Sequence, residues 1–67
     1  MELHQIRHFI AVAEAGGFTK GAQRAAVSQP AISASIAKLE AELEVKLLER
    51  RHSQVVPTAA GMRLLEV

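Results

Sequence analysis

The chain has 67 residues and a formal net charge of +1, which allows for one small domain and does not by itself indicate a partner. It contains no cysteine, which excludes disulfide bonds and thiolate metal sites, and its 49 % hydrophobic residues are too many for a disordered chain. No uncharged stretch approaches the roughly 20 apolar residues that span a membrane, and the N-terminus lacks the basic and apolar regions of a signal peptide, so we expect a cytoplasmic protein.

Helical spacing of apolar residues predicts a first helix over residues 3–15. Its expected core face consists of Leu3, Ile6, Ile10 and Ala13, with Phe9 beside them. Gly16 and Gly17 end this helix, because glycine accepts the left-handed conformation of a C-terminal cap. A short second helix is predicted over residues 20–26, with Thr19 as its N-cap.

A tight turn at residues 26–28 leads to a third predicted helix, which has Ser28 as its N-cap and runs to about Leu43. Pro30 is expected in its first turn, where the missing N–H costs no hydrogen bond. A 4-3-4 spacing of apolar residues predicts that one stripe of this helix faces the core. The stripe consists of Ile32, Ile36, Leu39 and Leu43.

Short β-prone runs at residues 45–48 and 55–56 flank the polar residues 51–54 and predict a hairpin. Pro57 closes the second strand, and Thr58 can cap a fourth helix. That helix has about two turns, and its apolar residues Met62, Leu64 and Leu65 have little to pack against, so we expect the chain to be cut within this element.

These elements predict a mainly α fold, a winged helix-turn-helix with three helices, a short β-hairpin wing and the start of a fourth helix. We expect one domain over residues 1–58, with the helix-turn-helix at about 18–37 and the wing at about 45–57, followed by a truncated helix at 59–67. This arrangement fits DNA, because the major groove is about 12 Å wide and admits one helix.

The face of the third helix opposite its core stripe is expected to meet DNA bases. Gln29 lies in the first turn and can form two hydrogen bonds with adenine N6 and N7. The predicted base-reading residues are Gln29, Pro30, Ser33, Ala34 and Ala37.

Other residues are expected to position the protein on the DNA backbone. Thr19 and Ser28 lie at helix N-termini, which favour phosphate, and the hairpin arginines suit phosphates or a narrow minor groove. Two basic segments also flank an acidic one at residues 40–49, which suggests one positive face. The predicted backbone-contacting residues are Thr19, Lys20, Ser28, Lys38, Arg50 and Arg51.

Several segments resemble the N-terminal domain of LysR-type transcriptional regulators, and together they cover nearly the whole chain. They are Phe18-Thr19, Gly21-Ala22, residues 27–33 (Val-Ser-Gln-Pro-Ala-Ile-Ser), Ile36, Leu39-Glu40, Leu43, Leu47-Leu48-Glu49-Arg50 and Pro57-Thr58-Ala59-Ala60-Gly61. The resemblance implies a bacterial, usually tetrameric regulator that binds promoter DNA. It also implies that the fourth helix is a dimerising linker and that a separate domain, absent from this chain, binds a small-molecule co-inducer.

The chain departs from the family pattern at several positions. Longer polar residues are usual at Ala34, Ser35 and Ala37, so base reading is expected to rest on Gln29, Pro30 and Ser33. Glycine is usual at Glu44, phenylalanine at Leu48 and leucine at Ala25, so the corner after the third helix and part of the core are expected to be looser.

The sequence offers four alternatives to DNA binding, and most of them have little support. His4 and His8 have the i, i+4 spacing of metal ligands but lack a third ligand, and no nucleophile–base spacing suggests catalysis, so we expect no metal, cofactor or enzymatic activity. No apolar helix carries the basic residues along one face, which disfavours membrane-surface binding. The main alternative is a small protein–protein interaction module, such as a truncated subunit that pairs with full-length regulators.

Overall fold

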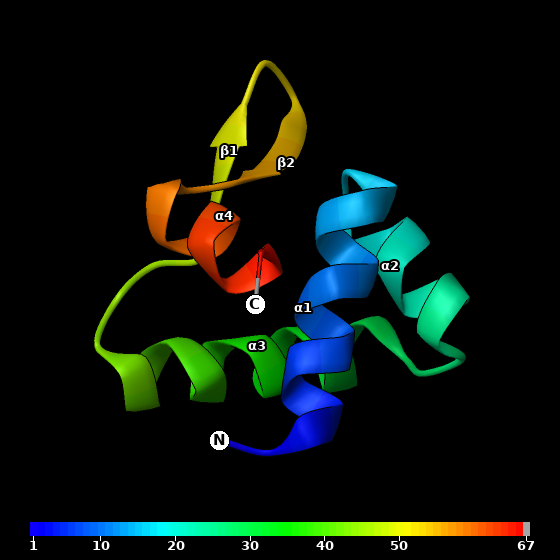
Figure 1. Cartoon of the computed structure of the whole chain (residues 1–67). Helices are drawn as coiled ribbons and strands as arrows, with labels where there is room; N and C mark the ends of the chain where they lie inside the picture. The colour runs from blue at the N-terminus through cyan, green and yellow to red at the C-terminus, as the bar shows by residue number, and fades with distance from the viewer. Residues whose placement is uncertain (67) are drawn as a thin grey trace.

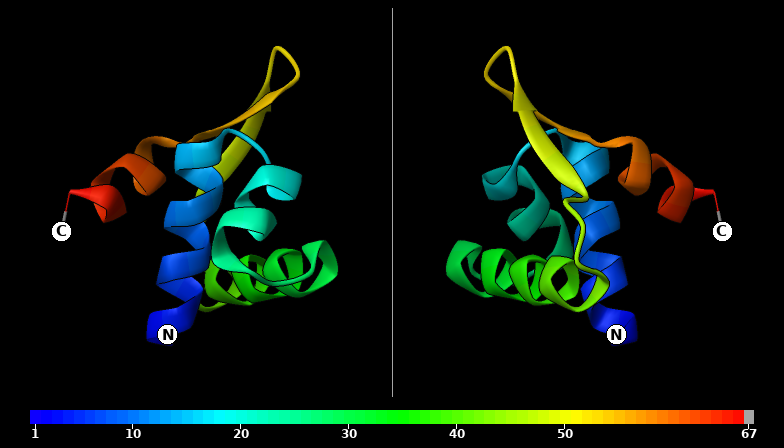
Figure 2. Two further views of the ribbon diagram at one scale, coloured as in Figure 1. Left: turned by 90° about the vertical axis from the view of Figure 1, so that its right-hand side faces the viewer. Right: turned by 90° about the vertical axis from the view of Figure 1, so that its left-hand side faces the viewer.

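The computed structural model describes residues 1–66, which form four helices and one two-stranded sheet (Figure 1). In chain order they are α1 (Leu3–Ala15), α2 (Phe18–Ala25), α3 (Gln29–Leu43), β1 (Leu48–Arg51), β2 (Gln54–Pro57) and α4 (Ala59–Leu65). Helices α1, α2 and α3 pack against one another, while the β-hairpin projects from them and α4 lies on the side of α1 away from α2 (Figure 2). The predicted mainly α winged helix-turn-helix is confirmed.

Helix α1 has the predicted bounds and buries Phe9 as expected, but the centre of its buried face is shifted from the predicted one. Gln5, Phe9 and Val12 are buried, whereas Leu3 is 63 % exposed. The remaining predicted core residues are only partly buried, and these are Ile6, Ile10 and Ala13. The two faces have similar helical spacing, and Gln5 tolerates burial because its Oε1 accepts a hydrogen bond of 2.9 Å from the backbone N–H of Glu2.

Helix α2 begins two residues earlier than predicted, and its N-cap is Gly17 rather than Thr19. The earlier start places Phe18 against the core. Close packing of α2 on α1 is confirmed at Gly21, where a Cβ would lie 2.8 Å from the Cα of Val12. A glycine is therefore needed at this helix crossing.

Helix α3 begins as predicted, because the Ser28 hydroxyl accepts a hydrogen bond of 3.2 Å from the N–H of Ala31. The turn before it includes Ala26 in the left-handed region (φ 59°). Three residues of the predicted core stripe are buried, and these are Ile32, Ile36 and Leu39. The fourth, Leu43, is 36 % exposed because it is the last residue of the helix.

The wing, defined here as residues 48–57, is an antiparallel hairpin in which Leu48 pairs with Pro57 and Arg51 with Gln54. His52 and Ser53 form its turn with φ values of 50° and 69°, the positive values that two-residue hairpin turns require. The predicted start of the first strand, at residue 45, is wrong by three residues, because residues 45–47 lie before β1.

The shift of β1 has a physical cause in the carboxylate of Glu40. Its Oε2 accepts hydrogen bonds from the backbone N–H groups of Leu47 (2.7 Å) and Leu48 (3.3 Å). These bonds anchor the start of the wing to α3, and Lys46 Nζ lies 3.8 Å from the same carboxylate. A long-range contact thus determines where the strand begins.

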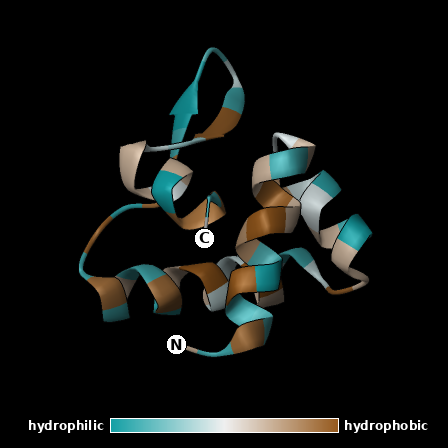
Figure 3. Cartoon of the chain, viewed as in Figure 1, coloured by the Kyte–Doolittle hydropathy of each residue, from teal (hydrophilic) through white to brown (hydrophobic). Residues whose placement is uncertain are grey.

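Helix α4 begins as predicted at Thr58, whose hydroxyl accepts a hydrogen bond of 3.1 Å from the N–H of Gly61. A Cβ at Gly61 would collide with the carbonyl oxygen of Leu47, so α4 packs closely on the segment before the wing. Leu64 packs against the core, contrary to expectation, whereas Met62 and Leu65 are 52 % and 37 % exposed. Figure 3 shows hydrophobic residues along this terminal helix.

Candidate nucleic-acid interface

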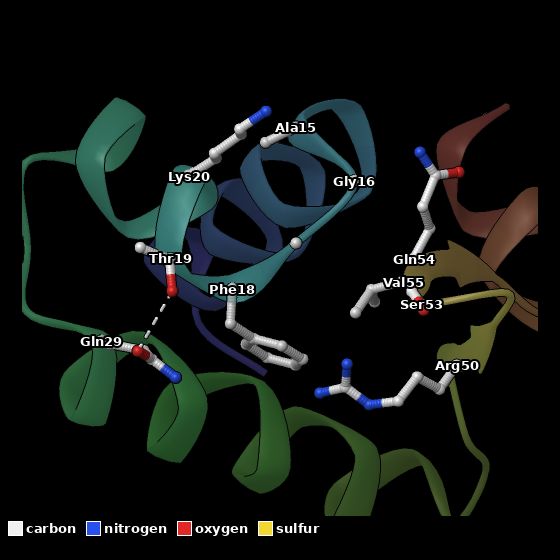
Figure 4. Close-up of a pocket in the computed structure, with 11 residues that line it drawn as sticks. Ala15, Gly16, Phe18, Thr19, Lys20, Gln29, Arg50, Ser53, Gln54 and Val55 are labelled. Carbon is white, nitrogen blue, oxygen red and sulfur yellow. Dashed lines mark hydrogen bonds between the residues drawn. The ribbon is translucent and has the colours of Figure 1, made fainter.

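A cleft of about 410 Å³ lies between the start of α2, the start of α3 and the wing (Figure 4). We call it the interface cleft. Four of its lining residues carry long or polar side chains that the sequence assigned to DNA binding, and these are Thr19, Lys20, Gln29 and Arg50. The structure therefore brings together, from three separate elements, residues that were predicted to act together.

The wing is held against the helices by a backbone hydrogen bond of 3.0 Å from the N–H of Val55 to the carbonyl of Gly16. This bond places Ser53 and Gln54 on the rim of the interface cleft, together with Gly16. The sequence does not indicate these residues, because their place depends on the hairpin register and on a contact between distant parts of the chain.

Thr19 and Gln29 contact each other directly. The Thr19 hydroxyl donates a hydrogen bond of 3.3 Å to Gln29 Oε1, and both side chains are exposed. Thr19 is therefore not the cap of α2, since Gly17 precedes the first turn, and its hydroxyl is directed to the next helix instead. The Ser28 hydroxyl is engaged within its own helix as the α3 cap.

The outer face of α3 largely matches the prediction. Pro30, Ala34 and Ala37 are exposed, as is Lys38, whereas Ser33 is half-buried. This face is formed by small side chains, so DNA could approach the helix backbone closely.

The two wing arginines have different surroundings. Side chains alternate between the faces of a strand, so Arg50 shares its face with the buried Leu48, while Arg51 shares the opposite face with Glu49. Arg50 lines the interface cleft, and Arg51 Nε lies 3.7 Å from Glu49 Oε2. Only one of the two predicted arginines therefore belongs to the cleft.

The histidines of α1 form a separate cluster. The His4 and His8 rings are edge-to-face with centroids 5.6 Å apart, and His8 Nδ1 lies 2.8 Å from Ser35 Oγ. Partial burial, and then the proximity of His4, lower the pKa of His8 from its ordinary value near 6.5. Within residues 1–66, no group of three or more histidine, aspartate or glutamate side chains could hold a metal ion.

A second hollow, of about 450 Å³, lies between α1 and α2 and shares no residue with the interface cleft. Arg7, Arg24 and Ala25 are among its lining residues. The sequence does not predict this hollow, although Ala25 is smaller than the leucine usual at this position. In the described part of the chain, no helix has the length and apolar character needed to cross a membrane.

Comparison with protein families and curated proteins identifies the chain's relatives. A family model described as "Bacterial regulatory helix-turn-helix protein, lysR family" matches residues 3–62. The chain is 52 % identical over 66 residues to the HTH-type transcriptional regulator TcbR of Pseudomonas sp. (strain P51), and 44 % identical over 61 residues to BenM of Acinetobacter baylyi. These matches cover 98 % and 91 % of this chain but 22 % and 20 % of the relatives, so the chain spans about a fifth of their length.

Solved structures show the same fold. The chain is similar to the protein in "Crystal structure of CbnR_DBD-DNA complex", with a TM-score of 0.91 and 52 % identity over 98 % of this chain and 76 % of that one. It is also similar to the protein in "Crystal Structure of BenM_DBD/catB site 1 DNA Complex", with a TM-score of 0.92 and 41 % identity over 98 % and 73 % of the two chains. With these matches and its winged fold, the chain belongs to the LysR family of bacterial regulatory helix-turn-helix proteins, as a DNA-binding domain of that family.

Proposed function

We propose that the chain docks on double-stranded promoter DNA with α3 in the major groove and the wing beside it. The observation that carries this proposal is the interface cleft, which is lined by Lys20 and Arg50 together with Gln29 at the start of α3. Two cations beside a helix that presents small, exposed side chains suit a phosphate backbone flanking a groove. Similar domains named CbnR_DBD and BenM_DBD were solved as DNA complexes, which supports the same partner here.

The contacts divide into two classes. We infer that α3 reads bases through residues that lie on its outer face or in its first turn, and these are Gln29, Pro30, Ser33, Ala34 and Ala37. The remaining cations, hydroxyls and helix N-termini position the domain on phosphates, and these are Thr19, Lys20, Ser28, Lys38, Arg50 and Arg51. Of these, Arg51 contributes least, because it lies outside the interface cleft and beside Glu49.

The domain acts by docking, without catalysing a reaction. Its relatives are transcriptional regulators, which supports promoter DNA as its partner and the bacterial cytoplasm as its location. Residues 1–58 form the DNA-binding unit, and α4 begins the linker through which two copies pair. The exposed Met62 and Leu65 suit that pairing, and two paired domains would contact two half-sites of a promoter.

A fluorescence-anisotropy titration of the 67-residue chain against a mixed pool of duplex DNA tests this function. We expect binding that weakens between about 50 and 200 mM salt, with a log–log slope of about −0.9 per phosphate contact. Lys20→Ala in the interface cleft should flatten this slope. Arg63→Ala is the matched control, because it removes an exposed cation from α4, on the far side of α1 from α2.

A chain that fails to bind is then fused to a dimeric coiled coil after residue 67. Binding that appears on fusion supports a domain that acts in pairs. Continued absence of binding would overturn the DNA proposal and favour a protein–protein interaction module.

A further inference from the structure

The hydrogen bond between Thr19 and Gln29 determines which end of the Gln29 amide is available to DNA. Oε1 accepts from the Thr19 hydroxyl, and Figure 4 shows Nε2 pointing away from Thr19. The capping of α3 does not compete for Gln29, because the Ser28 hydroxyl already accepts the N–H of Ala31.

The orientation of the amide has a consequence for base recognition. Glutamine pairs with adenine when Oε1 accepts from N6 and Nε2 donates to N7, which requires both ends of the amide to face one base edge. Thr19 engages one lone pair of Oε1, and the Nε2 donors point away from Thr19. Guanine offers two acceptors in the major groove, O6 and N7, whereas adenine offers one acceptor and cytosine offers a donor.

We propose that Thr19 is a positioning residue that orients the Gln29 amide with its Nε2 donors outward, so that the domain prefers guanine to adenine at the base pair that Gln29 meets. This inference rests on the proposed docking of α3 in the major groove. It replaces the adenine contact expected from the sequence, because that expectation treated Gln29 without its neighbour on α2.

The test is enrichment of bound sequences from a randomised duplex pool, followed by sequencing. Gln29→Ala first locates the position whose base preference depends on Gln29. Thr19→Val then removes the donor while keeping the shape of the side chain, and Thr19→Ser is the matched control that keeps the hydroxyl. Because Thr19 is exposed, both variants should fold, which circular dichroism and thermal unfolding check.

We expect the wild-type chain and Thr19→Ser to enrich guanine at the Gln29-dependent position. Thr19→Val frees Oε1, so the ratio of guanine to adenine should shift toward adenine by about fivefold, the lower end of what one two-bond base contact contributes.

Several results would overturn the inference while leaving DNA binding intact. They are adenine at that position in the wild-type chain, an unchanged ratio in Thr19→Val, the same shift in Thr19→Ser, or no position that depends on Gln29. A wild-type chain that binds no duplex, alone or as a coiled-coil fusion, would instead overturn the proposed function and this inference with it.

Discussion

Single residues at helix ends show where side-chain chemistry predicts local structure. Ser28 and Thr58 both cap helices as the sequence predicted, each accepting an N–H three residues ahead. Thr19 has the same chemistry but does not cap, because Phe18 enters the helix and packs on the core. A hydroxyl residue therefore predicts the start of a helix only when no apolar residue just before it favours an earlier helix start.

Glu44 is strained by its position at the C-terminal end of α3. It adopts the left-handed conformation (φ 55°), where its N–H donates to the carbonyls of Ala41 and Glu40. Because glycine adopts this conformation without the Cβ clash, Glu44→Gly should raise the free energy of unfolding by about 0.5–1 kcal/mol. Urea unfolding followed by circular dichroism measures the change.

Ala41→Gly is the matched control for Glu44→Gly. Position 41 lies within α3 and is exposed, so glycine there should lower the free energy of unfolding by about 1 kcal/mol. If Glu44→Gly lowers the free energy of unfolding as Ala41→Gly does, the left-handed conformation assigned to Glu44 is contradicted.

At the scale of elements, the wing shows that a predicted strand can be displaced without losing the fold. The β-prone residues 45–47 lie outside β1. The Glu40 carboxylate accepts hydrogen bonds from the N–H groups of Leu47 and Leu48, so the strand begins only at Leu48. Strand alternation counted from the observed start places Arg50 and Arg51 on opposite faces. The sequence alone could not separate these two arginines, because their faces depend on that start.

The two arginines are therefore expected to contribute unequally to DNA binding. Arg50→Ala should weaken binding to all duplexes and reduce the magnitude of the salt slope by about 0.9, the loss of one phosphate contact. Arg51→Ala should change both much less, because its guanidinium faces Glu49 on the other side of the hairpin. Anisotropy titrations at several salt concentrations compare the two variants, and an equal or larger effect of Arg51→Ala would contradict this assignment.

At the scale of the whole molecule, His8 makes the stability of the packing between α1 and α3 depend on pH. Its ring lies on α1 and contacts Ser35 of α3, and burial and His4 lower its pKa. The unfolded chain then binds more protons than the folded chain, so stability is fully present above about pH 6.5, the ordinary histidine value, and is lost as pH falls through the lowered pKa.

The free energy of unfolding should accordingly decrease on acidification below this pH, and His8→Gln should make the decrease shallower. Urea unfolding at a series of pH values measures both. His52→Asn is the control, because His52 is exposed in the wing turn and asparagine tolerates its positive φ. An unchanged profile in His8→Gln would contradict the role of His8.

The sequence by itself determined the order of the helices, two helix N-caps and the Gly16 C-cap, the hairpin and the family, because these follow from local periodicity, capping chemistry and a long motif. The tertiary structure decided which face of α1 is buried, where β1 begins and which residues meet in the interface cleft. Apolar residues recur with helical spacing on neighbouring faces of the same helix, so only contacts between distant residues determine which face is buried. The pairing of Thr19 with Gln29 is such a contact, since it depends on how α2 is placed against α3.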